Sequence, residues 1–325
     1  MQEFIHSVLS QDEAVVAGSV VTYALPVNPL SHILMTLRFN RTAAAAAAIP
    51  AFTNIPDMVP KIEVLFKGSG IFSMSAWDCI ACGIYVPHFE SWAVNYGGIA
   101  TEECSFTFCI PMGRVLYRPT ECFPRSTRGE LLLQITYAAA FVDITSVEAQ
   151  IETVELPEAD PVQYLKMTTL AATFTATGEN DVPLPIGHPI SDIVIWGGAH
   201  PEGVATLVTL GFLQVLLDNV RRFYSHTNYE THHNMAGRMR PAPGYWGYHR
   251  HYQAAAAALG SPVTAYDHIL ACYSHLPFDI FGDLSYALQT AGHSDAVLRI
   301  GVDAGVAGAG LGVRVIPCEI VPAKG

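Results

Sequence analysis

Hydrophobic and polar positions alternate with a period of two in many short stretches of the chain, the pattern of strands buried on one face only. Near the C-terminus, Leu298, Ile300 and Val302 alternate with Arg299 and Gly301. Proline and glycine clusters separate these stretches and predict turns. The pattern predicts roughly eight short strands in each half of the chain and an all-β fold. The stretches with the clearest strand character are 61–66, 106–110, 131–140, 147–154, 165–177, 190–196 and 204–217.

The two halves of the chain carry related sequences in the same order. The segment 25–35 (LPVNPLSHILM) resembles 184–195 (LPIGHPISDIVI), which has one additional residue. Further along, 62–68 (IEVLFKG) corresponds to 213–219 (LQVLLDN). A weaker correspondence relates the stretch that begins at Leu132 to the one that begins at Val297. Because three correspondences keep one order, we expect an internal duplication in which each copy forms its own structural unit.

The first 18 residues are expected to form an arm that precedes the first copy. Phe4, Ile5, Val8 and Leu9 recur at helical spacing, with polar residues between them. This spacing predicts a short amphipathic helix. We expect its apolar residues to lie in an interface, either with the body of the protein or with a neighbouring subunit.

An interruption near the middle of the chain predicts a linker between two domains. The segment 156–161 (LPEADP) contains two prolines and two acids between strand-like stretches, a composition typical of linkers. The predicted domains are therefore the arm, residues 1–18, a first domain over 19–156 and a second domain over 157–325.

The second domain carries a long irregular insertion at about 234–277. Tyr, Trp and Arg are enriched at protein–protein interfaces, so we expect the aromatic residues of the insertion to form a subunit or receptor contact. Two alanine runs, 43–48 and 254–258, predict a few helical turns in loops, because alanine favours helices and is depleted in strands. The aromatic residues expected at an interface are Tyr245, Trp246, Tyr248 and Tyr252.

Candidate metal ligands also lie in this insertion. On a strand, His249 and His251 would point to the same side, an arrangement that can bind a metal ion. The spacing lacks the specificity of paired CxxC motifs, so these two histidines are candidates only and the expected set of cofactors and metals is empty.

Composition restricts the classes of function. Of the 325 residues, 50% are hydrophobic and 14% are charged, against roughly 25% charged residues in typical soluble domains. We therefore expect copies of the chain or partner proteins to cover part of the surface. The net charge of −12 argues against nucleic-acid binding, which needs clustered Lys and Arg. No stretch reaches the ~18 apolar residues of a membrane span, and the N-terminus lacks signal-peptide features, so we expect synthesis in the cytoplasm.

The seven cysteines are expected to be reduced and buried, because their number is odd and they are scattered. Cys79 and Cys82 form a single CxxC motif, whereas a zinc knuckle needs a second pair. We place this motif on a strand, where residues three positions apart point to opposite faces. The motif therefore predicts neither a zinc site nor redox chemistry.

Catalytic motifs are not found in the sequence. Asp192, Asp283, His293 and Asp295 could act as acids or bases, but no nucleophile elbow, HExxH motif or phosphate-binding loop accompanies them. We therefore expect no enzyme activity.

The paired openings of the two copies resemble a known family, the double jelly-roll major capsid proteins of tailless icosahedral viruses and phages. Tectivirus-like and corticovirus-like lipid-containing phages are the nearest comparison. In that family each jelly roll often opens with a strand, a Leu-Pro turn and a second strand of the form Pro-hydrophobic-x-x-Ile, which 25–33 and 184–193 match. The next strand ends at a Gly or Asn turn, as at Gly68 and Asn219. The resemblance implies two tandem jelly-roll β-barrels with a short N-terminal helix and few loop helices.

The same resemblance implies a structural function in a bacteriophage or other icosahedral virus. Three copies would form a homotrimer with a pseudo-hexagonal outline, and a lattice of these capsomers would tile the virion shell. Expected partners are further copies of the chain and other capsid proteins at the vertices, and an internal viral membrane is left open as another. The expected location is the capsid, after synthesis in the host cytoplasm.

Two alternatives remain open from the sequence. A β-sandwich that binds or degrades glycans would show a deep cleft with convergent carboxylates and aromatic residues. A minor capsid or spike protein of the same fold would differ in copy number and not in chain fold.

Overall fold

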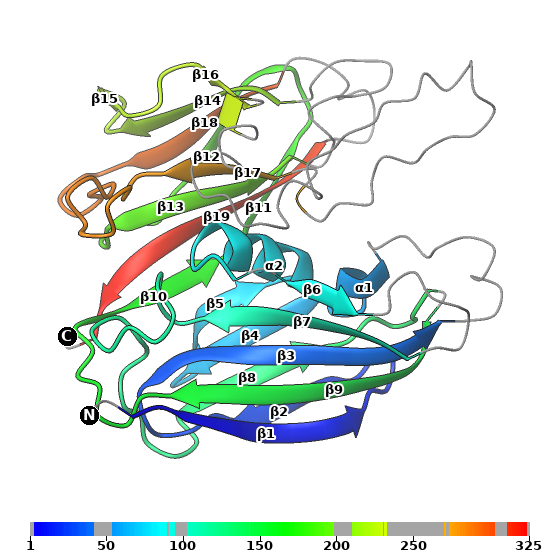
Figure 1. The fold of residues 1–325 in the computed structure, drawn as a ribbon. Coiled ribbons are helices and arrows are strands. Elements are labelled where there is room, and N and C mark those ends of the chain that lie inside the picture. The colour runs from blue at the N-terminus through cyan, green and yellow to red at the C-terminus, as the bar shows by residue number, and fades with distance from the viewer. Residues whose placement is uncertain are drawn as a thin grey trace, which may run out of the picture. The chain divides into compact units, whose positions relative to one another are not determined.

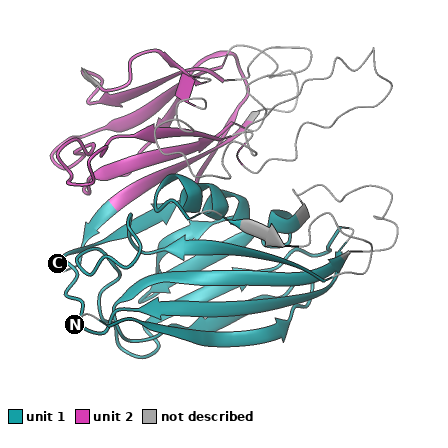
Figure 2. Cartoon of the chain, in the orientation of Figure 1, with its two compact units in different colours: residues 1–168, 320–325 teal, residues 169–319 magenta. Residues whose placement is uncertain are grey.

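The computed structural model describes residues 3–41, 54–89, 91–94, 103–142, 144–197, 210–229, 231–232, 270, 273–302 and 311–323. In these residues the chain is mainly β-sheet, with two helices (Figure 1). The chain divides into two compact units, which are residues 1–168 with 320–325 and residues 169–319 (Figure 2). The predicted linker segment 156–161 is a turn that leads from one strand of unit 1 to the next. The domain bounds 19–156 and 157–325 stay a prediction.

Unit 1 contains two layers of strands. One sheet has the order β1-β9-β3-β7-β6, and the other has the order β10-β5-β4-β8-β2. Successive strands of the chain repeatedly change sheet, as in the Greek keys of a jelly roll. The strands are β1 (Ile5–Ala14), β2 (Val20–Ala24), β3 (Leu30–Arg41), β4 (Lys61–Phe66), β5 (Ser69–Met74), β6 (Trp92–Val94), β7 (Glu103–Pro111), β8 (Leu131–Thr136), β9 (Ile144–Glu155) and β10 (Gln163–Thr168).

Unit 2 repeats this strand order. Its sheets have the orders β11-β19-β13-β17 and β12-β18-β14-β15, and β16 also pairs with β14. These correspond strand for strand to β1-β9-β3-β7 and β2-β8-β4-β5 of unit 1. The strands are β11 (Leu170–Phe174), β12 (Gly178–Pro183), β13 (Ile190–Trp196), β14 (Leu210–Leu217), β15 (Arg221–Arg222), β16 (Thr227–Asn228), β17 (Tyr273–Pro277), β18 (Ala296–Val302) and β19 (Leu311–Pro322).

Backbone hydrogen bonds repeat in the two units at the positions that the sequence correspondence predicts. Leu30 and Phe123 exchange two hydrogen bonds of 2.9 Å, and Ile190 and Leu288 exchange two of 3.0 and 2.9 Å. Both Leu30 and Ile190 are fully buried. A register shift follows each of them, between Leu30 and His32 on β9 and between Ile190 and Asp192 on β19. The internal duplication is therefore present in hydrogen bonding as well as in sequence.

The turns that end the second correspondence also repeat. Lys67 and Gly68 have φ of 50° and 82°, and Asp218 and Asn219 have φ of 49° and 56°. Positive φ at two consecutive residues is the requirement of a type I′ hairpin turn, which favours Gly and Asn. This requirement explains why the sequence pattern has Gly68 in one copy and Asn219 in the other.

The predicted N-terminal helix is wrong, because residues 5–14 form strand β1. This strand pairs antiparallel with β9 from Ile5 opposite Glu155 to Ala14 opposite Glu148. Ser7 donates to Glu155 Oε1 at 3.3 Å, a polar contact that the helical assignment did not consider. Four apolar residues at helical spacing are a short signal, and pairing with an open sheet edge outweighs it.

The placement of Cys79 and Cys82 on a strand is also wrong, because both lie on helix α2 (Ala76–Tyr85). The Ser75 side chain caps this helix by accepting from the backbone N–H of Asp78 at 3.2 Å, the role that serine favours at a helix N-terminus. Both thiols are buried. The shorter helix α1 spans Asn54–Asp57, and the alanine runs 43–48 and 254–258 lie outside the described residues.

Candidate assembly surface

Each unit has an end at which short turns and loops connect the strands. In unit 1 this end is defined by Leu30 opposite Glu155 and by His32 opposite Pro111. In unit 2 it is defined by Ile190 opposite Glu319, together with Asp192 opposite Pro277. We call these the turn ends of the two units.

Large hydrophobic side chains are exposed at both turn ends. Surface apolar residues that gather in one region mark interaction sites more often than scattered ones do. Those in the turns, loops and strand starts of the turn ends are Phe4, Val27, Val115, Tyr117, Ile186, Val220, Ile280, Phe281 and Tyr286.

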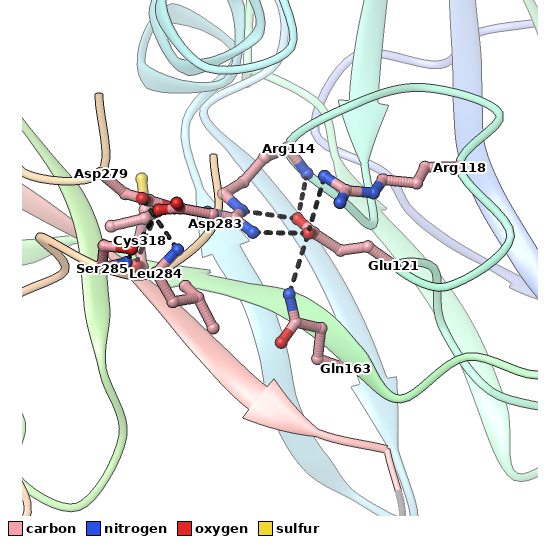
Figure 3. A network of polar contacts seen from close by, with 10 residues as sticks. Arg114, Arg118, Glu121, Gln163, Asp279, Asp283, Leu284, Ser285 and Cys318 are labelled. Carbon is pink, nitrogen blue, oxygen red and sulfur yellow. Dashed lines mark hydrogen bonds and ion pairs between the residues drawn. The ribbon is translucent and has the colours of Figure 1, made fainter. Parts of the chain in front are cut away.

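A buried ion pair holds the loop 112–122 at the turn end of unit 1. Arg114 donates to Glu121 through Nε to Oε1 at 2.7 Å and through Nη2 to Oε2 at 2.7 Å (Figure 3). Gln163 Nε2 donates to Glu121 Oε2 at 3.0 Å. Burial alone would raise the pKa of Glu121, but the hydrogen bonds and charge of Arg114 outweigh burial, so the pKa lies below its ordinary value. The loop is thus anchored by an ionised carboxylate.

Gly113 allows this loop to close. A Cβ atom at Gly113 would lie 2.2 Å from the carbonyl oxygen of Glu121. The backbone approaches too closely there for any other residue. No sequence signal singled out Gly113, Arg114 or Glu121, because a Gly-Arg pair seven residues before a Glu is not a recognised pattern.

Tyr117 is held in an unusual conformation at the tip of the loop. Its φ is 63°, which is rare for a bulky residue and persists only when surrounding contacts require it. The backbone N–H of Tyr117 donates to Ser31 Oγ at 2.8 Å. Its ring packs edge to face on Phe4, with centroids 5.4 Å apart, and on the buried His32, at 5.0 Å. These contacts fix the position of the half-exposed Phe4 and Tyr117 side chains.

A surface pocket of about 190 Å³ opens beside Tyr117. Its lining combines the N-terminal arm, the loop 112–122 and the segment 156–161. It is smaller than the roughly 300–1,000 Å³ of typical small-molecule sites, so it is suited to a single side chain. The lining residues are Glu3, Phe4, Tyr117, Pro119, Leu156, Glu158 and Ala159.

Unit 2 has an equivalent loop over 278–288. The N–H of Phe278 donates to Ser191 O at 2.9 Å, as the N–H of Met112 donates to Ser31 O at 3.0 Å. Asp279 Oδ1 accepts from the N–H of Leu284 at 2.9 Å (Figure 3). This loop also displays exposed aromatic side chains, Phe281 and Tyr286, with ring centroids 5.7 Å apart.

The turn between β14 and β15 is anchored by Asp218. This carboxylate accepts from the N–H and the hydroxyl of Ser294, both at 2.8 Å, and from the N–H of Asp295 at 3.0 Å. His293 Nδ1 lies 2.7 Å from its other oxygen. The contact with His293, followed by the Ser294 hydrogen bonds, holds the pKa of Asp218 well below its usual range.

The acids and bases named from the sequence are not brought together. Asp192 Oδ1 lies 2.8 Å from His275 Nε2, and both side chains are buried. His293 pairs with Asp218 instead. In the part of the chain that the structure describes, no three His, Cys, Asp or Glu side chains are arranged to hold a metal ion. His249 and His251 lie outside that part.

The predicted interface residues fall into two groups. Phe4, Ile5 and Val8 are exposed, and Leu9 is partly buried. Their place in an interface stays a prediction. The other four, Tyr245, Trp246, Tyr248 and Tyr252, lie outside the described residues, as does most of the insertion 234–277.

Among the helices that the structure describes, neither is long and apolar enough to cross a membrane.

Comparison with known proteins relates the whole chain to one fold. No protein-family model and no curated protein sequence matches it. Solved structures do match, at low sequence identity. The major capsid protein P2 from bacteriophage PM2 is 12% identical with a TM-score of 0.60, and the match covers 98% of both chains. The major capsid protein of Sulfolobus turreted icosahedral virus is 11% identical with a TM-score of 0.63, over 98% of this chain and 97% of that chain. The capsid of the PBCV-1 virus gives 11% identity and a TM-score of 0.58, over 98% and 94%. The predicted all-β fold of two tandem jelly rolls is confirmed.

Proposed function

We propose, from the premise that the entire chain folds as a double jelly roll, that this protein is the structural major capsid protein of an icosahedral virus or bacteriophage. The observation that carries the proposal is the end-to-end match to such capsid proteins, 98% of each chain in the case of PM2. The match leaves no additional domain in this chain that would need a separate function. We expect no catalytic activity.

The internal repeat supports a trimer as the building block. Two units with the same strand order count as two similar wedges, so three chains around an axis place six wedges in a ring. Such a ring has a nearly hexagonal outline, and hexagons tile a flat facet. A charged fraction of 14% suits permanent interfaces, which are more hydrophobic than transient ones.

The exposed apolar side chains at the turn ends indicate where further contacts form. Candidates are neighbouring copies, other capsid proteins at the vertices and an internal viral membrane. The N-terminal residues Phe4, Ile5 and Val8 are proposed as part of these contacts because they are exposed hydrophobic residues. The protein would be made in the host cytoplasm and would end in the virion shell.

Mass in solution and particle outline together test the proposal. Light scattering after size-exclusion chromatography should give about 105 kDa, three times the 35.1 kDa of one chain. Negative-stain images of the same peak should show pseudo-hexagonal particles. A stable monomer at all concentrations would rule out the capsomer, and glycan-binding assays would then test the β-sandwich alternative.

A further inference from the structure

Val220 is the most exposed large hydrophobic residue in the described part of the chain, at 84%. It lies in the turn between β14 and β15, where Leu217 pairs with Arg221. In the equivalent turn of unit 1, Phe66 pairs directly with Ser69. The unit 2 turn therefore has three residues where the unit 1 turn has two, and Val220 is the additional one.

The protrusion of Val220 is rigidly supported. Its N–H donates to Leu217 O at 3.0 Å, and Asp218, two residues earlier, accepts three hydrogen bonds from Ser294 and Asp295. A fixed turn loses little conformational entropy when it binds. The sequence continues with two arginines, Arg221 and Arg222. The turn thus combines an exposed apolar side chain with two adjacent positive charges.

The pocket beside Tyr117 has the complementary composition. Its lining includes the apolar residues Phe4, Pro119 and Leu156 and contains two acids, Glu3 and Glu158, but no Lys or Arg. Both glutamates are exposed. Its volume of about 190 Å³ suits a single branched side chain. Arg114, whose backbone leads into the same loop, is already paired with Glu121 and leaves these two acids unneutralised.

We propose that this pocket receives Val220 from the turn of a second copy of the chain, with Glu3 and Glu158 complementing the charge of Arg221 and Arg222. The contact joins unit 1 of one copy to unit 2 of another. It is therefore heterologous, the type of contact that produces closed rings or extended lattices. Charge pairs at its rim would fix the register and speed encounter more than they would add affinity. The inference rests on the proposed function, because it assumes that copies associate.

A charge-reversal cycle tests the contact. Glu3→Lys with Glu158→Lys should raise the concentration of half-assembly about tenfold or more, because like charges then face each other. Arg221→Glu with Arg222→Glu should have a similar effect. The chain that carries all four changes should assemble again near the native concentration. Sedimentation velocity over a concentration series measures each value, and circular dichroism checks that every variant keeps its β-sheet content.

The apolar part of the contact has its own test and a matched control. Val220→Asp should weaken assembly about tenfold or more, since a buried carboxylate would replace an apolar side chain. Val16→Asp serves as the control, because Val16 is 68% exposed and lies in a different loop; it should leave assembly unchanged. If all of these variants assemble like the native chain, the contact is wrong while the capsid function stands. If the native chain never assembles, the proposed function itself fails.

Discussion

Arg114 and Glu121 form a two-pronged ion pair inside unit 1, with side chains that are only 8% and 1% exposed. Such a pair stabilises a fold only while both partners are present, because an unpaired buried charge is strongly unfavourable. The pair fixes the loop that carries Tyr117 and thereby the shape of the adjacent pocket.

Glu121→Gln should lower the free energy of unfolding by about 3 kcal/mol, because it leaves the Arg114 guanidinium buried without its counter-charge. Urea unfolding followed by circular dichroism measures the change. Glu158→Gln is the control, since Glu158 is exposed and its loss should matter by less than about 0.5 kcal/mol. Equal stability of the two variants would contradict a structural role for the ion pair.

Gly113→Ala should lower the free energy of unfolding by roughly 1–3 kcal/mol, the usual cost of overpacking. The added methyl group would lie 2.2 Å from Glu121 O, so the loop would have to move. Gly70→Ala is the matched control, because nothing lies within 4 Å of its Cβ position. Thermal unfolding of the two variants should separate them clearly, and a tolerated Gly113→Ala would show that the loop is not tightly constrained.

Acidification should destabilise the protein through His32 and His232. Burial lowers the pKa of both from 6.5 to about 4, with the charge of His6 adding for His32 and that of His275 for His232. The unfolded chain therefore binds more protons between pH 6.5 and 4, and stability falls as the pH drops through this window. Each histidine should contribute roughly 3 kcal/mol to that fall.

The variant His32→Asn with His232→Asn should show a flatter dependence of stability on pH. Urea unfolding at intervals from pH 7.0 to 4.5 provides the comparison. Identical slopes in the native chain and the variant would assign the acid sensitivity to other groups. His188→Asn serves as a control in the same experiment, because His188 is partly exposed and its substitution should leave the slope unchanged.

Removal of residues 1–14 should unfold or aggregate the protein. Strand β1 covers the edge of β9 along its length, and an uncovered edge promotes association with other strands. A peripheral helical arm, the structure first expected for this segment, could be removed without that effect. Circular dichroism and sedimentation of the truncated chain distinguish the two outcomes.

Six cysteines should resist thiol reagents until the chain unfolds. Burial raises the pKa of Cys79, Cys109 and Cys122, and the thiolate is the reactive form. Peptide mapping after labelling in native buffer and in urea provides the test. Rapid labelling in native buffer would contradict burial. The cysteines expected to be protected are Cys79, Cys82, Cys104, Cys109, Cys122 and Cys318.

The sequence was informative wherever a turn imposes a residue type. The Leu-Pro openings and the turns at Gly68 and Asn219 could be found because they recur in both copies at positions where few residues fit. The N-terminal segment was misassigned because β1 depends on a partner, β9, that lies about 150 residues away, and local periodicity carries no information on such pairing.

The anchored loops were missed for a related reason. Arg114 and Glu121 act through a pairing that only the folded loop produces, and the corresponding loop of unit 2 uses a different carboxylate, Asp279. The equivalence of Glu155 and Glu319, each opposite the first residue of a strand, has a faint sequence signal in the hydrophobic residues that follow both, but it is too short to recognise without the strand pairing.

The pairing of β1 with β9 also sets a schedule for synthesis. Ile5 lies opposite Glu155, so the first strand leaves the ribosome long before its partner exists. At roughly 5–20 residues per second the nascent chain must carry an unpaired β1 for about 10–30 s. Two register shifts in β1, after Val8 and after Ser10, interrupt its flat edge and would discourage pairing with other nascent chains during that interval. β11 must wait in the same way for β19, so the chain passes through this exposed interval twice.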